Sequence, residues 1–353
     1  MTRRKRNKLF QIACRTRVNH DLWLYLKNKV HKYKLHRVRS TEVAYPSSVM
    51  LELTNHCNLQ CTICPRQYAY GHEMDKGYMS LENAKKIVDE LYPCLDSIGL
   101  TGLGETFLYP HLEELALYIK SKKKSIVISL STNANVAGFV ENVAKVMPHV
   151  DTIQISIDGI DEVYEKIRVG AKFETLKTNL RQIADLAKGW KNVDLMFNMV
   201  IAKDNYHQMG QVIEFAHEIG VKCVNFTYLN LASLTDIDVD YYKFYRSSEF
   251  ESALTEARLM MKKYSSVEVT GLDSRDNVGF DKCPFPWSHF YITWDGWVVP
   301  CCAKPFPKLM NFGNVYADGV MPVLNSDKFQ QFRKNWMQNK YPRFCEKCHF
   351  IDL

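Results

Sequence analysis

Three closely spaced cysteines constrain this chain more than any other feature. Cys57, Cys61 and Cys64 form a C-x3-C-x2-C triplet directly after the apolar run 49–54. Such a run indicates a buried strand that ends in a loop. Three thiolates on one tight loop match three corners of a cubane iron–sulfur cluster, and no fourth Cys or His follows closely enough to bind the last iron. The spacing therefore predicts a cluster with one iron left open for a small molecule.

Two other interpretations of the triplet fit its spacing less well. A structural zinc site needs four closed protein ligands, and these usually come from two C-x2-C pairs. Cysteines that only fill an apolar core need no regular spacing at all. We therefore prefer the iron–sulfur interpretation.

The triplet resembles the cluster loop of the radical S-adenosylmethionine (radical SAM) enzymes. In that family the open iron chelates the amino and carboxylate groups of the methionine moiety. One-electron reduction then breaks the sulfonium and yields a 5′-deoxyadenosyl radical, which abstracts a substrate hydrogen. The resemblance implies that Cys57, Cys61 and Cys64 bind this cluster and are catalytic. Ile63 stands where the family usually has an aromatic residue, a difference that affects packing near the adenine.

The rest of the chain predicts a parallel α/β architecture. From about residue 46, apolar β-rich runs alternate with amphipathic helical windows, which is typical of βα units. We expect strands at 49–53, 97–101, 125–131, 152–157, 194–200 and 222–226. The helical windows between them are 80–92, 112–121, 138–146, 173–188 and 206–219. Six such units predict a partial (β/α)6 barrel of the TIM type, whose chemistry collects at the carboxyl ends of the strands.

The turn after the second expected strand resembles a cofactor-binding turn of the same family. Residues 102–105 read Gly-Leu-Gly-Glu, close to the Gly-Gly-Glu-Pro motif that approaches the methionine amino group. The resemblance implies that Gly104 allows close backbone approach and that Glu105 accepts a hydrogen bond from that group. Leu103 and Thr106 depart from the motif, and an ordinary tight turn is the alternative.

Polar residues at later strand ends extend the resemblance. Ser131, Asn133 and Ser156 stand where hydroxyl and amide groups of the family bind the ribose and carboxylate of the cofactor. Arg168 matches an arginine that pairs with the cofactor carboxylate, and a surface arginine at a helix end is the alternative. Cys223 shares a strand face with polar residues, and a lone thiol near a radical site can donate a hydrogen atom, which would give epimerisation. We favour a structural role because Cys223 lies far below the catalytic end.

A second cysteine set lies near the C-terminus. Cys283, Cys301, Cys345 and Cys348 are embedded in a Cys-Pro-x-Pro-Trp segment, an Asp-Gly hairpin, a Gly-x4-Cys step and a terminal C-x2-C. This order resembles the SPASM/twitch auxiliary-cluster domain, and it is closest to the single-cluster form of radical SAM alcohol dehydrogenases. The resemblance implies a fully thiolate-ligated 4Fe-4S cluster. Cys302 remains an alternative to Cys301, and structural zinc is the alternative to the cluster.

Charge divides the chain unevenly. Residues 1–45 contain 13 Lys and Arg against two acidic residues, whereas the remainder contains 33 against 37. We therefore expect a basic, helical N-terminal arm at 1–45, a radical SAM barrel at 46–265 and a SPASM/twitch domain at 266–353. The arm is suited to contact with an anionic membrane surface or an acidic substrate, and simple packing on the barrel is the alternative.

Together these features predict a cytoplasmic radical SAM oxidoreductase with two 4Fe-4S clusters. No apolar run approaches twenty residues, and the clustered cysteines indicate a reducing compartment. The closed auxiliary cluster would accept an electron while a carbohydrate or other alcohol is oxidised. Peptide modification by crosslinking or epimerisation is the alternative, and we rank it second because no leader-peptide module precedes the barrel. A non-catalytic metal-binding protein is the remaining class. The resemblance implies a flavodoxin- or ferredoxin-type electron donor and no nucleic acid.

Overall fold

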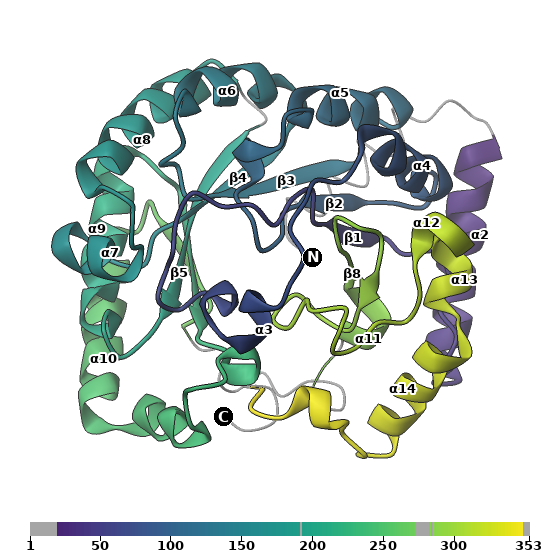
Figure 1. The fold of residues 1–353 in the computed structure, drawn as a ribbon. Coiled ribbons are helices and arrows are strands. Elements are labelled where there is room, and N and C mark those ends of the chain that lie inside the picture. Colours follow the sequence, from purple (N-terminus) through teal and green to yellow (C-terminus); the bar gives the residue numbers. More distant parts are fainter. Residues whose placement is uncertain (1–19, 191–192, 273–282, 284, 349–353) are drawn as a thin grey trace.

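The computed structural model describes residues 20–190, 193–272, 283 and 285–348. Within them, one curved nine-stranded sheet runs in the order β7-β6-β5-β4-β3-β2-β1-β8-β9, and helices cover its convex face (Figure 1). The strands are β1 Ser48–Leu51, β2 Ser97–Leu100, β3 Val127–Thr132, β4 Thr152–Ser156, β5 Asp194–Ile201, β6 Cys223–Tyr228, β7 Glu268–Thr270, β8 Phe290–Ile292 and β9 Val298–Val299. All neighbours are parallel except the antiparallel β8–β9 pair.

The helices follow the strands in the expected alternation. They are α2 His20–Arg37, α3 Ala69–His72, α4 Leu81–Leu91, α5 Leu112–Lys122, α6 Phe139–Val146, α7 Asp161–Ile167, α8 Phe173–Lys188, α9 Met209–Ile219, α10 Ser248–Lys263, α11 Phe285–Ser288, α12 Val315–Asp318, α13 Val320–Leu324 and α14 Asp327–Met337. No helix among the residues described is both long and apolar enough to cross a membrane.

The six predicted βα units are confirmed, with element ends shifted by a few residues. Ser80 caps α4 by accepting a hydrogen bond from the Asn83 N–H, as its place before the helical window predicts. The short helix α7 was not predicted. It begins after a Gly-Ile turn and has only seven residues, too few for the helical period to stand out.

Two elements extend the sheet beyond six units. Strand β7 pairs with β6, and the β8–β9 hairpin joins the opposite edge by pairing β8 with β1. Both lie after residue 265, so the sheet crosses the division that the sequence suggested between the barrel and the C-terminal domain. The barrel and the C-terminal region therefore share one continuous sheet across residue 265.

Side chains on each strand alternate between two environments. The buried set, for example Ile128, Leu130 and Phe197, faces the covering helices and forms the core. The half-exposed set lies on the opposite, concave side of the sheet and is mostly polar, as Ser129 and Asn198 illustrate. Because closed barrels fill this interior with bulky apolar side chains, a polar and accessible interior indicates room for ligands.

Candidate active site

The cysteine triplet lies on the loop after β1, at the carboxyl ends of the parallel strands. The loop is pinned to the end of α7, since the Gln60 N–H donates to the Val169 carbonyl at 2.9 Å and the Thr62 N–H to the Ile167 carbonyl at 2.8 Å. The Cys64 N–H also donates to the Cys61 carbonyl at 3.0 Å, which tightens the turn between the second and third cysteines. The backbone therefore holds the triplet in a fixed shape.

The surroundings of the three thiols suit an anionic cluster. Burial raises the pKa of all three thiols, that of Cys61 to about 12, so binding of a metal cluster must displace their protons. Arg66 and Arg168 oppose this shift electrostatically. The Nε atoms of both arginines are buried without a hydrogen-bond partner among the described residues. Two cations with unused donors beside three thiols fit a cubane held by three thiolates.

The spacing of possible ligands also bears on the kind of metal centre. Among the residues that the structure covers, no group of three or more His, Cys, Asp or Glu side chains is arranged around one metal ion. Each thiol of a cubane site binds a different iron. The thiols therefore surround the whole cluster and do not converge on one metal ion.

The Gly-Leu-Gly-Glu turn packs against the cluster loop. A Cβ on Gly104 would lie 2.3 Å from the Thr54 carbonyl oxygen and 2.5 Å from that of His56. The Glu105 N–H donates to the same His56 carbonyl at 2.8 Å. The glycine is thus required for close approach of two backbone segments, in addition to any contact with a cofactor.

Glu105 itself is buried and already engaged. Its carboxylate accepts hydrogen bonds from the Thr132 hydroxyl at 2.8 Å, the Phe107 N–H at 3.1 Å and the Asn133 N–H at 2.7 Å. These three contacts tie the loop after β2 to the end of β3. A carboxylate has about four acceptor positions, so one remains for a ligand such as an ammonium group.

We predict that Gly104→Ala prevents assembly of the first cluster. The added methyl group must push the backbone around Thr54 and His56 away, which displaces Cys57. The matched control is Gly99→Ala on β2, where the nearest atom to a new Cβ lies at 3.6 Å. Iron content and the visible spectrum of reconstituted protein check this. Normal iron binding by the Gly104 variant would contradict it.

The remaining predicted cofactor contacts surround the loop. Asn133 is buried and its amide donates to the Asn58 side chain at 2.9 Å and weakly to the Cys57 sulfur at 3.9 Å. Ser131 and Ser156 lie on the concave side of β3 and β4, half-exposed to the interior. Ile63 is half-buried against the apolar core.

Arg168 is largely buried and pairs with Asp158, a residue that the sequence did not single out. Its Nη2 pairs with Asp158 Oδ2 at 2.7 Å, and its Nη1 lies 4.0 Å from the Cys61 sulfur. Burial opposes its charge, but Asp158, Cys61 and Tyr164 together outweigh burial, so the pKa of Arg168 is raised. Asp158 is 1% exposed and also accepts a hydrogen bond from the Val200 N–H, so it ties the end of α7 to β5. Its place directly after β4, at the carboxyl end of a strand, was the available signal.

The four C-terminal cysteines come together in space. Burial raises the pKa of Cys283 and Cys345 to about 12, and the neighbouring Cys348 thiol adds to both shifts. The pKa of Cys301 is also raised by burial, with further contributions from Cys302, Cys348 and Cys345. Thiols that are separated by up to 65 positions in the sequence thus lie within electrostatic range of one another. Their arrangement suits a cluster.

The terminal cysteine pair is anchored to the segment that follows β6. The Asn230 amide donates to the Cys348 sulfur at 3.6 Å, and the Tyr242 hydroxyl donates to the Lys347 carbonyl at 2.7 Å. The Lys347 ammonium donates to the Ile237 carbonyl at 2.8 Å. The second cysteine set is therefore fixed on the barrel and not on a separate lobe.

Cys302 lies near the second set as well, since it contributes to the raised pKa of Cys283 and the Cys348 thiol contributes to its own. It lines a small cavity of about 120 Å³ in the barrel interior, together with Met50, Ser129 and Tyr291. Cys302 is exposed, whereas Cys301 is only partly so. This difference favours Cys301 as the member of the second set.

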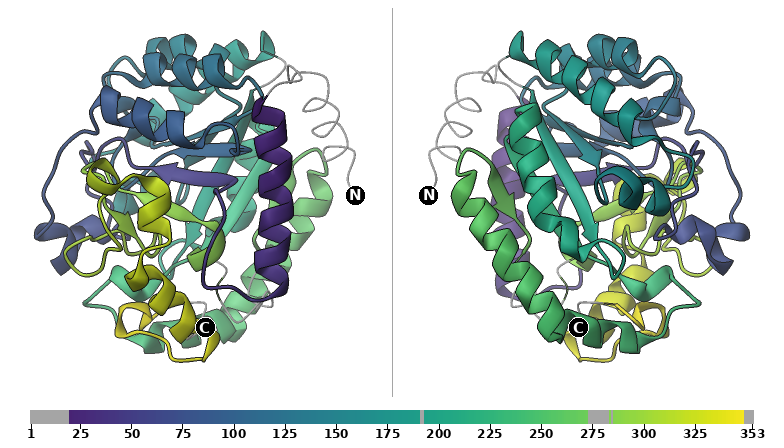
Figure 2. Two further views of the ribbon diagram at one scale, coloured as in Figure 1. Left: turned by 90° about the vertical axis from the view of Figure 1, so that its right-hand side faces the viewer. Right: turned by 90° about the vertical axis from the view of Figure 1, so that its left-hand side faces the viewer.

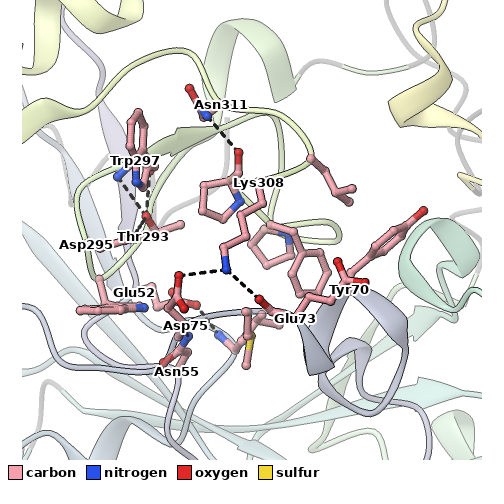
Figure 3. Close-up of a pocket in the computed structure, with 17 residues that line it drawn as sticks. Glu52, Asn55, Tyr70, Glu73, Asp75, Thr293, Asp295, Trp297, Lys308 and Asn311 are labelled. Carbon is pink, nitrogen blue, oxygen red and sulfur yellow. Dashed lines mark hydrogen bonds and ion pairs between the residues drawn. The ribbon is translucent and has the colours of Figure 1, made fainter.

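A larger cavity of about 280 Å³ lies where the two cysteine-bearing regions meet (Figure 3). One wall is formed by Asn55 and the segment 70–75, and the other by Trp294, Trp297 and the segment 305–311. The Lys308 ammonium spans the two walls by donating to the Glu73 carbonyl at 2.9 Å and pairing with Asp75 at 3.0 Å.

Glu52 lines this cavity and joins the two regions. It is 2% exposed, and its Oε2 accepts hydrogen bonds from the Tyr291 hydroxyl at 2.5 Å and the Leu103 N–H at 2.9 Å. Burial raises the pKa of Glu52 to about 7, although these donors oppose the shift. Sequence reasoning missed Glu52 because a single acid in an apolar run carries no motif.

We predict that Glu52→Gln flattens the dependence of stability on pH. The pKa of Glu52 is raised above its unfolded value, so the native state binds the extra proton between about pH 4.5 and 7, and stability falls as pH rises through that window. Between about pH 6 and 8 the loss is about 1.4 kcal/mol. Denaturant unfolding of both proteins at these two pH values measures it. An equal pH dependence of wild type and variant would contradict the assignment.

The fold and site define an α/β protein with a curved parallel sheet and two cysteine sets at its carboxyl-end edge. The model for the radical SAM superfamily matches residues 51–216, and the model for the SPASM iron–sulfur cluster-binding domain matches residues 283–349. The chain therefore belongs to the radical SAM superfamily and carries a SPASM domain. Its cofactors are S-adenosylmethionine and 4Fe-4S clusters, one that binds this cofactor and one auxiliary.

Several known proteins resemble the chain along most of its length. A tungsten-containing aldehyde ferredoxin oxidoreductase cofactor-modifying protein of Pyrococcus furiosus is 24% identical, over 86% of this chain and 87% of the relative. The subtilosin biosynthesis protein AlbA of Bacillus subtilis is 23% identical over 92% and 69%. A PqqA peptide cyclase of Bradyrhizobium diazoefficiens is 24% identical over 90% and 83%.

A solved structure confirms the fold. SuiB of Streptococcus suis, bound to S-adenosylmethionine, superposes with a TM-score of 0.64 at 14% identity, over 92% of this chain and 73% of SuiB. The alternation of strands and helices that was predicted from the sequence is thus a radical SAM architecture, and the chain is a radical SAM enzyme.

Proposed function

We propose that this enzyme modifies a peptide. The relatives support this more than they support alcohol oxidation, which the sequence alone ranked first. The similar proteins include a peptide cyclase and a bacteriocin biosynthesis protein. Crosslink formation or epimerisation at a peptide residue is therefore the preferred class of reaction.

The observation that carries the proposal is the cavity between the two cysteine-bearing regions. Its walls come from the cluster-loop side and from the SPASM side, so a group bound there touches both. Trp294, Trp297 and Phe306 supply aromatic surface, and Asn55, Asp75 and Lys308 supply polar groups. A cavity of about 280 Å³ is near the lower end of the usual range for ligand sites, so it suits one side chain of a longer substrate.

We assign roles to the residues as follows. Cys57, Cys61 and Cys64 hold the first cluster, and Arg66 and Arg168 balance its negative charge. When bound, the cluster and S-adenosylmethionine supply a 5′-deoxyadenosyl radical that removes a hydrogen atom from the substrate. Ser131 and Ser156 on the concave face contact the cofactor, with Asn133 and Glu105 holding the loop that presents it. Gly104 permits the close packing of that loop, and Ile63 packs beside the adenine.

The second cysteine set holds a closed cluster in this proposal. Cys283, Cys301, Cys345 and Cys348 saturate its four irons, so the cluster serves in electron transfer and not in substrate binding. Residues 46–265 form the catalytic barrel and residues 266–353 the auxiliary domain, with β7 and β8 as shared strands. A small flavodoxin or ferredoxin is the expected class of reductant.

The test compares two substrate classes. Reconstituted enzyme receives S-adenosylmethionine, a reductant and either short precursor peptides encoded beside its gene or a panel of sugars and polyols. We expect a peptide to lose two hydrogens by crosslinking, or to gain one solvent deuterium by epimerisation, as mass spectrometry reports. Formation of a ketone from a sugar, with unchanged peptides, would overturn the proposal in favour of alcohol oxidation.

A further inference from the structure

Helix α2 carries apolar side chains on the face that points away from the protein. Trp23, Leu26, Val30 and Tyr33 are between 54% and 62% exposed. Their spacing of three, four and three residues places them on one face of the helix. Figure 2 shows α2 lying lengthwise along the outside of the barrel. A helix that only packs on a barrel would carry polar side chains on this face.

The opposite face of α2 is fixed to the protein. The Tyr25 hydroxyl and the Lys29 ammonium both bind Asp96 at 2.8 Å. The amide of Asn28, which is 7% exposed, donates to the Tyr45 carbonyl at 2.9 Å. These contacts fix the rotation of the helix about its axis. The apolar face is therefore held in an exposed position.

Cations flank the exposed apolar residues. The Lys27 ammonium lies 4.8 Å from the centre of the Trp23 ring, and the Arg37 guanidinium lies 5.9 Å from that of Tyr33. Lys34 is also exposed on the same helix. Long basic side chains beside aromatic rings are typical of a helix that lies in a lipid headgroup layer.

A second observation comes from a cavity of about 570 Å³ beside the C-terminal half of α2. Its apolar lining includes Leu35, Val43 and Trp287. Its charged lining consists of Lys32 and Arg39, with Glu42 as the one acidic residue. Lys32 has no hydrogen-bond or ion-pair partner among the described residues, and burial lowers its pKa to about 8. An anion at this position would supply the missing partner of the ammonium group.

We propose that the exposed face of α2 and the adjoining cavity mouth bind the surface of an anionic lipid bilayer. The apolar residues would enter the headgroup region, and Lys27, Lys34 and Arg37 would face lipid phosphates. The net charge of +11 on residues 1–45, against −4 on the rest of the chain, favours an anionic partner for this part alone. Trp23, Leu26, Val30 and Tyr33 favour lipid over an acidic protein as the partner. These side chains need an apolar environment, which the interior of a bilayer provides.

The test measures partition of the full-length, cluster-loaded protein onto vesicles of phosphatidylcholine with and without phosphatidylglycerol. We expect binding only to the anionic vesicles, and loss of binding at high salt. Leu26→Ser with Val30→Ser should lower the partition coefficient about tenfold, because each substitution removes an apolar side chain that would be partly buried in the bilayer. Lys27→Glu with Lys34→Glu should lower the partition coefficient at least as much, because two attractive charges near the anionic surface become repulsive.

The matched control is Leu117→Ser with Leu259→Ser, which removes two exposed leucines from α5 and α10. This control should partition as the wild type does, and all variants should cleave S-adenosylmethionine normally. Equal partition of the α2 variants and the wild type would overturn the proposal. So would absence of binding to anionic vesicles at low salt, or a dimer in solution that the α2 variants abolish, because a second copy would then cover this face.

Discussion

Replacing Cys57, Cys61 and Cys64 together with alanine is expected to remove about four of about eight irons and all cleavage of S-adenosylmethionine. The reason is that the two cysteine sets lie on different segments, the first on the loop after β1 and the second around the SPASM hairpin and the terminal pair. Loss of one set leaves the other complete. Iron analysis and detection of 5′-deoxyadenosine in anaerobically reconstituted protein measure both effects.

A single substitution provides the control for this result. Cys94→Ala changes a thiol that is 6% exposed before β2, far along the chain from both sets, and should retain all the iron and full activity. Zinc in place of half of the iron, or residual cofactor cleavage by the triple variant, would contradict the assignment of the first set.

Cys348→Ala is expected to separate cofactor cleavage from product formation. The variant keeps the first cluster, so it should still form 5′-deoxyadenosine, while the modified product falls to background. The physical reason is that a substrate radical on the way to a crosslink must give up a second electron, and an incomplete auxiliary cluster does not accept it. Parallel quantification of 5′-deoxyadenosine and of modified substrate in single-turnover reactions measures the split.

Two further variants sharpen this test. Cys301 and Cys302 both lie near Cys348, and Cys302 also lines the interior cavity. With Cys301 as the ligand, Cys302→Ala should leave the auxiliary cluster intact. Cys223→Ala should be neutral if the reaction is an oxidation. A normal yield of oxidised product from Cys348→Ala would exclude the electron-acceptor role. Uptake of solvent deuterium with inverted configuration, lost in the Cys223 variant, would identify an epimerase.

Local patterns in the sequence determined the first cysteine set and the order of strands and helices. The triplet Cys57, Cys61 and Cys64 lies on one short loop, so its spacing limits which metal centres it can form. The alternation of β-rich runs with helical windows likewise reports short-range periodicity. The rule that parallel βα units place their loops at one edge then locates the site at the strand ends. The roles of Ser131, Ser156 and Arg168 rested on the family resemblance and stay predictions.

Only the tertiary structure decided which distant residues meet. Glu52 and Tyr291 are 239 positions apart and share a hydrogen bond because β8 pairs with β1, a register that no local pattern encodes. The Asp158–Arg168 pair depends on α7, a helix too short to predict. The outward orientation of Trp23 and Leu26 depends on which face of α2 binds Asp96. Sequence periodicity determines which residues share a face of a helix or strand. Packing between elements then determines which of these faces is exposed to solvent.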